Sequence, residues 1–121
     1  GLLNAMANVS MLAISDENNN LGEFKGVMAE QYVLQELRTN YKTEIYYWST
    51  DNARAEIDFL IENNGEIVPI EVKSSENLQA KSLRVFSEKF SPKVCIRFSM
   101  SDFRDDDWLM NFPLWAVSCL V

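Results

Sequence analysis

The sequence predicts an α/β domain in which helices flank a mixed β-sheet. Two strand-like runs, residues 55–63 and 66–74, surround an Asn-Gly pair, which is typical of a tight antiparallel hairpin. A helix-like segment at residues 78–90 lies between the second of these runs and another strand-like run at residues 94–98. A helix that connects two strands implies a right-handed crossover and parallel pairing. The 121 residues suit a single compact domain.

The N-terminal part of the chain is predicted to be helical. Residues 2–14 are rich in Leu, Met and Ala, which favours a helix, and residues 16–22 form a polar break with three consecutive asparagines. A second helix is expected over residues 23–39, where apolar side chains recur at helical spacing. These side chains are Val27, Val33, Leu34 and Leu37.

Three strands are expected to follow the second helix. Residues 44–49 (EIYYWS) are mostly β-branched or aromatic, which predicts a strand. The next two strands, residues 55–63 and 66–74, are joined by Asn64 and Gly65, and we expect this pair to form a type I′ turn. The turn then fixes the register, because paired residues are counted outward from it.

The C-terminal part is expected to contain one helix and one further strand. The helix covers residues 78–90, with Asn77 as its N-cap and with an apolar stripe of Leu83, Phe86 and Phe90. A strand is predicted at residues 94–98, and residues 101–110 are expected to be irregular or a short helix. Residues 113–120 are apolar, and both strand and helix remain open for them.

The hairpin register gathers charged side chains on one face. Counting outward from the turn places Asp58 opposite Glu71 and Glu56 opposite Lys73. Directly opposed residues have Cβ atoms roughly 4.5–5.5 Å apart, so two carboxylates at this distance repel each other. The other face is expected to be apolar throughout, because it carries the pairs Ile57–Val72, Phe59–Ile70 and Ile61–Val68.

Two interpretations of the charged face remain open. A divalent cation, which prefers hard oxygen ligands, would relieve the repulsion between Asp58 and Glu71. Lys73 would point to the same face, because it lies two residues after Glu71 on the strand. The alternative is an ordinary solvated face, on which Glu56 and Lys73 form a common cross-strand pair.

Glu30 favours the metal site. It shares a helix face with the apolar stripe, so we expect it to point toward the sheet. The residues on this face are Gly26, Val33, Leu34 and Leu37. An unpaired buried carboxylate is unfavourable, and a place in the acidic site would remove that cost. The alternative is a glutamate at the edge of the stripe that reaches out to water.

Several kinds of site are excluded because their residues are missing. Without histidine, neither a Ser-His-Asp nor a Cys-His site can form, and two cysteines cannot make an ordinary structural zinc site. The sequence has no P-loop and no GxGxxG motif. Cys95 and Cys119 lie in apolar surroundings and are expected to be buried free thiols. No signal peptide is recognisable, which predicts a cytoplasmic location.

The distribution of charge leaves one further question open. The net charge of −7 argues against strong non-specific binding of nucleic acid by the chain as a whole. Five cationic residues nevertheless cluster in sequence around the helix at residues 78–90 and the following strand. They are Lys81, Arg84, Lys89, Lys93 and Arg97. They form either a local basic surface or an ordinary solvated helix face.

The run AEIDFLIENNGEIVPIEVKSS resembles the D-x(n)-E-x-K signature of the PD-(D/E)xK nuclease superfamily. Asp58 matches the motif aspartate, and Glu71 and Lys73 match E-x-K. Glu30 matches the helix glutamate of members that resemble Holliday-junction resolvases. Ile57 stands where the nominal motif has proline. The resemblance implies a restriction-endonuclease-like fold with an α-α-β-β-β-α-β core.

Most of the chain resembles more closely the uncharacterised C-terminal domain of prokaryotic AAA+-type ATPases. The matching segments are GVMAEQYVLQEL, IYYWSTDNARAEIDF, VPIEVKSS, AKSLRVF, CIRFS and FPLWAV. This resemblance implies that residues 1–121 form one domain at the C-terminal end of a longer ATPase, which fits the missing P-loop. Within it we expect an N-terminal helix and loop over residues 1–22, a nuclease core over residues 23–99 and a C-terminal extension over residues 100–121.

Together the resemblances imply a deoxyribonuclease that depends on Mg²⁺ or Mn²⁺. The expected site consists of Asp58, Glu71, Glu30 and the carbonyl of Val72 as metal ligands, Lys73 as the catalytic cation and Glu56 beside it. The expected partners are DNA and the ATPase module of the same full-length chain, without membrane association. The alternative is a nuclease fold without catalysis, which would serve the ATPase as a DNA-binding or protein-binding module.

Overall fold

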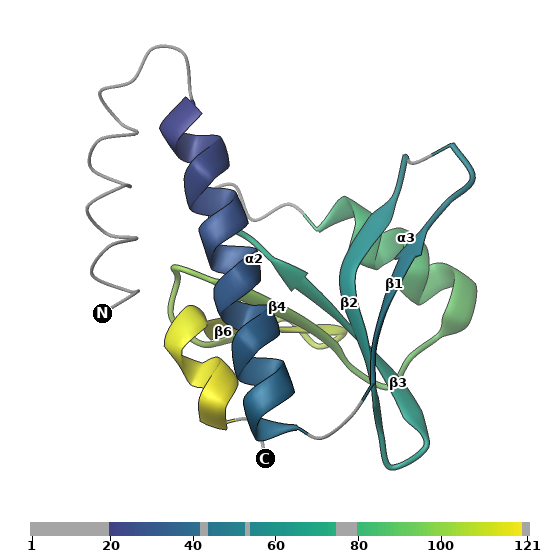
Figure 1. The fold of residues 1–121 in the computed structure, drawn as a ribbon. Coiled ribbons are helices and arrows are strands. Elements are labelled where there is room, and N and C mark those ends of the chain that lie inside the picture. Colours follow the sequence, from purple (N-terminus) through teal and green to yellow (C-terminus); the bar gives the residue numbers. More distant parts are fainter. Residues whose placement is uncertain (1–19, 42–43, 53, 75–79, 120–121) are drawn as a thin grey trace.

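The computed structural model describes residues 20–41, 44–52, 54–74 and 80–119. They form a six-stranded mixed sheet in the order β1-β2-β3-β4-β6-β5, with helices packed against it (Figure 1). The α/β class predicted from the sequence is therefore confirmed. The elements in chain order are α2 (Asn20–Asn40), β1 (Ile45–Ser49), β2 (Glu56–Asn63), β3 (Glu66–Val72), α3 (Lys81–Phe90), β4 (Cys95–Ser99), β5 (Arg104–Asp105), β6 (Leu109–Pro113) and the 3-10 helix η1 (Leu114–Cys119).

The sheet combines antiparallel and parallel pairing. Strands β1, β2 and β3 pair in antiparallel fashion, whereas β3 pairs with β4 and β4 with β6 in parallel. Helix α3 connects β3 to β4, which confirms the predicted helical crossover and its parallel pairing. The expectation of an irregular or helical segment at residues 101–110 is wrong, because this segment contains β5 and the start of β6. Residues 113–120, left open between strand and helix, contain all of η1.

The hairpin between β2 and β3 follows its prediction closely. Asn64 and Gly65 have φ values of 54° and 81°, and a type I′ turn requires positive φ at both central residues. The five residue pairs beyond the turn have the predicted register, and the last of them is Phe59–Ile70. Local turn chemistry therefore sets the alignment of the two central strands.

Strand β2 contains a β-bulge that the sequence pattern does not reveal. Its register with β1 shifts so that Tyr47 faces two residues, Asp58 and Phe59. One consequence is that Ile57 packs with the α3 core, whereas Phe59 and Ile61 pack with the α2 core. The prediction that these three residues share one apolar face is therefore wrong, because an extra residue reverses the alternation.

Two apolar cores lie on the two faces of the sheet. The larger core joins the sheet to α2 and η1, and the smaller core joins it to α3. The α2 side contributes Ala29, Val33, Leu34 and Leu37 to the larger core, and the α3 side contributes Leu83 and Phe86 to the smaller one. Trp48 of β1 extends the smaller core, since its ring lies edge-on to the rings of Phe86 and Phe90 at centroid distances of 5.3 and 6.0 Å.

Two members of the predicted stripes are exposed. Val27 is 58% exposed, because it lies two residues, or about 200° of helical rotation, from the buried Ala29. Phe90 is also exposed, although its ring contacts Phe86 at a centroid distance of 4.7 Å. Cys95 is buried as expected, whereas the prediction for Cys119 is wrong, because it lies exposed at the end of η1.

The ends of both helices differ from their predictions. Helix α2 begins at Asn20 within the predicted polar break, and α3 begins at Lys81 with Ala80 at its N-cap position. Asn77, the predicted N-cap, and the helix expected at residues 2–14 lie outside the described residues. None of the helices in the described ranges is long and apolar enough to cross a membrane.

Candidate functional site

The predicted acidic site lies where β2 and β3 stop pairing. The backbone pairing ends at Phe59–Ile70. Just beyond this pair, Oδ2 of Asp58 accepts a hydrogen bond from the N–H of Val72 at 2.8 Å. The side chain of Asp58 is therefore fixed to β3 at the residue that follows Glu71.

The direct cross-strand opposition expected from the turn is not present at this end. The pairing does not reach Asp58–Glu71 or Glu56–Lys73. The bulge in β2 explains the difference, because a bulge bends its strand and interrupts the regular ladder. Asp58 still lies close enough to Glu71 for its charge to affect that carboxyl group. The structure thus brings the two carboxylates together through a side-chain bond and not through the ladder.

Glu71 is the most constrained member of the site. It is only 6% exposed, and its Oε1 lies 3.5 Å from Nζ of Lys73. Its Oε2 is buried and has no hydrogen-bond partner among the residues that the structure describes. Burial raises the pKa of Glu71 and outweighs the nearby charge of Lys73, while the charge of Asp58 raises it further. One oxygen of this carboxyl group is therefore left without a hydrogen bond among the described residues, although the charges of Lys73 and Arg97 both act on the group.

Asp58 is half-buried and has a raised pKa for the same main reason. Burial raises the pKa of Asp58, whereas the Val72 N–H and the charge of Lys73 lower it. The charge of Glu56 raises the pKa of Asp58 a little more. Lys73, itself one-third exposed, thus compensates two neighbouring carboxylates incompletely, although the charge of Arg97 also acts on Glu71. A further positive charge would lower both pKa values.

Glu30 approaches Asp58 from α2, whereas Glu71 and Lys73 do not line the pocket that Glu30 shares with Asp58. This surface pocket measures about 330 Å³, and Glu56 also lines it. Desolvation, and then the charge of Asp58, raise the pKa of Glu30. The expectation that Glu30 lies near Asp58 therefore agrees with the structure. The expectation that it is buried is wrong, because Glu30 borders this pocket and stays exposed.

Helix α2 reaches the site through a close backbone approach. A Cβ atom placed on Gly26 would lie 3.4 Å from Oγ of Ser74, which follows the E-x-K residues on the chain. This is close to an ordinary van der Waals contact, so Gly26 marks the place where α2 passes the end of β3. Glu30 lies about one helical turn further along α2.

The donor set suits a hard divalent cation. Asp58 and Glu71 supply carboxylate oxygens, Glu30 lies close enough to Asp58 for the two charges to interact, and such oxygens are the ligands that Mg²⁺ and Mn²⁺ prefer. No group of three or more His, Cys, Asp or Glu side chains is close enough to form a complete metal cage within the described ranges. The fit therefore rests on two protein carboxylates, one of which has an unpartnered oxygen. The role of the Val72 carbonyl stays a prediction.

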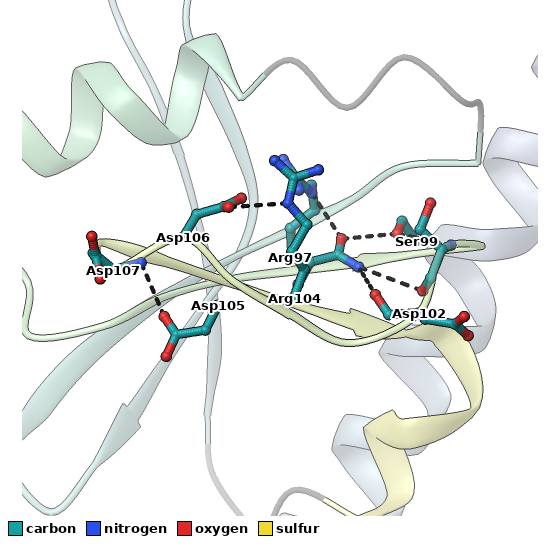
Figure 2. Close-up of polar contacts among 9 residues, drawn as sticks. Arg97, Ser99, Asp102, Arg104, Asp105, Asp106 and Asp107 are labelled. Atoms are coloured by element: carbon teal, nitrogen blue, oxygen red, sulfur yellow. Dashed lines mark hydrogen bonds and ion pairs between the residues drawn. The ribbon is translucent and has the colours of Figure 1, made fainter.

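A buried polar row continues from Glu71 across the sheet, and the sequence did not reveal it as a unit. Glu71 pairs with Arg97 on β4, Arg97 with Asn111 on β6, and Asn111 with Arg104 on β5. Arg97 and Asn111 are buried, and Nε of Arg97 donates to Oδ1 of Asn111 at 2.9 Å (Figure 2). The one available signal was the arginine inside the apolar run CIRFS.

A family model matches residues 25–117, which is most of the chain and contains all of the site residues named above. Its description is "Domain of unknown function (DUF4143)". The chain belongs to this family. Glu30, Asp58, Glu71 and Lys73 are thus part of the DUF4143 domain itself. No curated protein and no solved structure matches the chain significantly.

Proposed function

We propose that this DUF4143 domain is a metal-dependent nuclease that hydrolyses phosphodiester bonds of DNA. The observation that carries the proposal is the buried carboxylate of Glu71, whose Oε2 has no hydrogen-bond partner among the described residues and whose pKa stays raised beside Asp58 despite the charges of Lys73 and Arg97. A buried carboxylate of this kind is unfavourable unless a cation compensates it. Mg²⁺ or Mn²⁺ between the two carboxylates would supply that charge.

In the proposed reaction each site residue would have a separate role. Asp58 and Glu71 hold the metal ion, with the Val72 carbonyl as a further ligand. When bound, such an ion supplies a nucleophilic water at neutral pH and offsets the charge on the reacting phosphate. Lys73 is partly exposed, so its ammonium group can contact both Glu71 and the substrate phosphate and stabilise negative charge as it develops. Glu30 positions water beside Asp58.

The surroundings of the site also support the proposal. Asp58 and the E-x-K residues resemble the PD-(D/E)xK signature, and they lie on a hairpin followed by a helical crossover within a mixed sheet. Glu56 lines the pocket beside Asp58, where it could help to position Lys73. The resemblance to C-terminal domains of AAA+-type ATPases suggests an ATPase module of the same full-length chain as the partner.

One observation favours a second candidate, a nuclease-like module that binds DNA or a protein without cleavage. The net charge of −7 opposes the approach of a polyanion to the chain as a whole. Metal binding without hydrolysis would support this candidate over the first. The two functions are therefore separated by a cleavage assay.

The test is nicking of supercoiled plasmid in the presence of Mn²⁺. Wild type should cleave, and Lys73→Ala should lower the rate by about 100-fold or more, as expected for loss of a group that stabilises the transition state. Lys93→Ala is the matched control, because Lys93 is an exposed lysine that pairs with Glu66 at the protein surface. Equal cleavage by wild type and Lys73→Ala, or no cleavage by either, would contradict the proposal.

A further inference from the structure

A basic pocket lies on the α3 side of the sheet, next to the carboxylate site. It measures about 500 Å³, and its lining includes Lys81, Arg84, Arg97, Arg104, Asp106 and Trp108. The whole chain has 11 cationic and 18 acidic side chains, yet four cations and one acid line this pocket. The lining of the pocket therefore has an excess of positive charge that the net charge of the chain conceals.

The arginines of the pocket are held in place by specific contacts. Nε of the buried Arg97 donates to Asn111 at 2.9 Å. The guanidinium of Arg84 lies 4.8 Å from the centre of the Trp108 ring. Nε of Arg104 donates to Oδ1 of an aspartate on the pocket wall at 3.0 Å. Side chains that are positioned before binding lose less conformational entropy when a ligand arrives.

The start of α3 adds to the attraction for an anion. Ala80 lines the pocket at the N-cap position of this ten-residue helix. An alanine side chain cannot accept a hydrogen bond, and α3 has no side-chain cap within the part of the chain that the structure describes. The first N–H groups of the helix carry the positive end of the helix dipole. The helix end and the four cations thus both attract an anion to the pocket.

The pocket is adjacent to the candidate catalytic residues. Arg97, which lines the pocket, pairs with Glu71 across β3 and β4, and laterally paired residues project from the same face of a sheet. The charge of Glu71 also raises the pKa of Arg97, against the stronger lowering caused by burial. The basic pocket therefore begins one strand away from the carboxylate that would bind the metal ion.

We propose that this pocket binds a phosphate group of a nucleic-acid strand whose neighbouring phosphodiester lies at Glu71. Forked guanidinium groups match the geometry of phosphate oxygens, and three arginines line the pocket. The phosphate-binding part of the proposal stands on the pocket alone, whereas the position of the neighbouring phosphodiester rests on the proposed nuclease function. The pocket would supply the local attraction that a net charge of −7 otherwise denies to the chain.

The test is the fluorescence anisotropy of a labelled single-stranded oligonucleotide, measured in EDTA so that cleavage cannot occur. The pocket variant is Lys81→Glu/Arg84→Glu. The control is Lys89→Glu/Lys93→Glu, which changes the net charge equally at exposed residues that do not line the pocket. Thermal melting checks that both variants remain folded.

The pocket variant should raise the Kd by about tenfold or more. It should also reduce the slope of log K against log salt concentration by the amount that corresponds to about two phosphate contacts. The control should stay within about threefold of wild type, since charges outside the pocket act only at long range through salt. An equal effect of the two variants, or no effect of either, would overturn the proposal that this pocket binds phosphate.

Competition with ATP distinguishes two possible sources of the phosphate group, a nucleic-acid strand and a free nucleotide. The oligonucleotide should bind more tightly than ATP, and equal competition by ATP would overturn the assignment to a nucleic-acid strand. Because all of these measurements are made without metal, they do not depend on hydrolysis. Binding that is lost in the pocket variant while wild type never cleaves plasmid would retain the phosphate pocket and reject the nuclease.

Discussion

The carboxylate of Asp58 accepts a hydrogen bond from the backbone N–H of Val72 at 2.8 Å. This bond joins β2 to β3 just beyond the last residue pair of the hairpin. It places one carboxylate beside Glu71 and at the same time satisfies a partly buried donor. Asp58 therefore has a structural role in addition to its proposed role as a metal ligand, and the two roles can be measured separately.

Two substitutions of Asp58 should separate these roles. Asp58→Ala should lower the free energy of unfolding by about 1–3 kcal/mol, because it leaves the Val72 N–H without its acceptor. Asp58→Asn retains an oxygen acceptor and should stay close to wild type in stability. Urea unfolding in EDTA, followed by tryptophan fluorescence, measures both values. An equal loss of stability in the two variants would show that the hydrogen bond is unimportant.

Glu71→Gln should stabilise the metal-free protein. The substitution removes a buried negative charge while it keeps the size of the side chain and an acceptor for Lys73. We expect the free energy of unfolding to rise by about 1 kcal/mol, as is common where a functional site is not optimal for stability. Glu66→Gln is the control, because its pair with Lys93 is exposed and such pairs contribute little. A destabilised Glu71→Gln protein would contradict the electrostatic description.

The stability difference between Glu71→Gln and wild type should depend on pH. Folding raises the pKa of Glu71, so the native state holds this proton more tightly than the unfolded state does. The resulting stabilisation is fully present below the unfolded-state pKa of about 4, and it is lost as pH rises through the higher folded-state pKa. The advantage of Glu71→Gln should therefore grow between about pH 4 and pH 7. Urea titrations between about pH 4 and pH 7 measure this stability difference. A difference that stays constant over this pH range would contradict a raised pKa of Glu71 in the folded state.

The hairpin turn offers a test of the fold that is independent of the site. Gly65→Ala should lower the free energy of unfolding by about 1 kcal/mol, because an L-residue is strained at the positive φ of this position. Asn64→Gly is the control, since glycine adopts positive φ without steric cost. Thermal melting of the two variants compares them directly. A Gly65→Ala protein as stable as wild type would mean that the turn is not of the type I′ form.

The sequence predicted those features of the fold that depend on local chemistry. Asn64 and Gly65 determine the turn, and the turn determines five residue pairs of the central hairpin. Helical spacing identified α2 and α3, and the helix between two strands identified the parallel crossover. These features are predictable because each depends on residues that are close in sequence.

Features that depend on contacts between distant segments were not predictable in this way. The bulge opposite Tyr47 places Ile57 and Phe59 on different faces, although their spacing in sequence fits a regular strand. Strands β5 and β6 lie in a segment with an acidic run, and their pairing is decided by β4. The same holds for the site. The turn places Asp58 near Glu71, but the hydrogen bond between Asp58 and the N–H of Val72 could be found only in the structure.

Binding of Mn²⁺, followed by isothermal titration calorimetry, tests the central claim most directly. Wild type should bind one ion, or two if Glu30 holds a second, and both Asp58→Asn and Glu71→Gln should weaken the binding by at least about tenfold. Glu62→Gln, an exposed carboxylate of β2, should leave the affinity unchanged. A wild-type protein that binds no Mn²⁺, or a Glu71→Gln protein that binds it as tightly as wild type does, would contradict a metal site at Asp58 and Glu71.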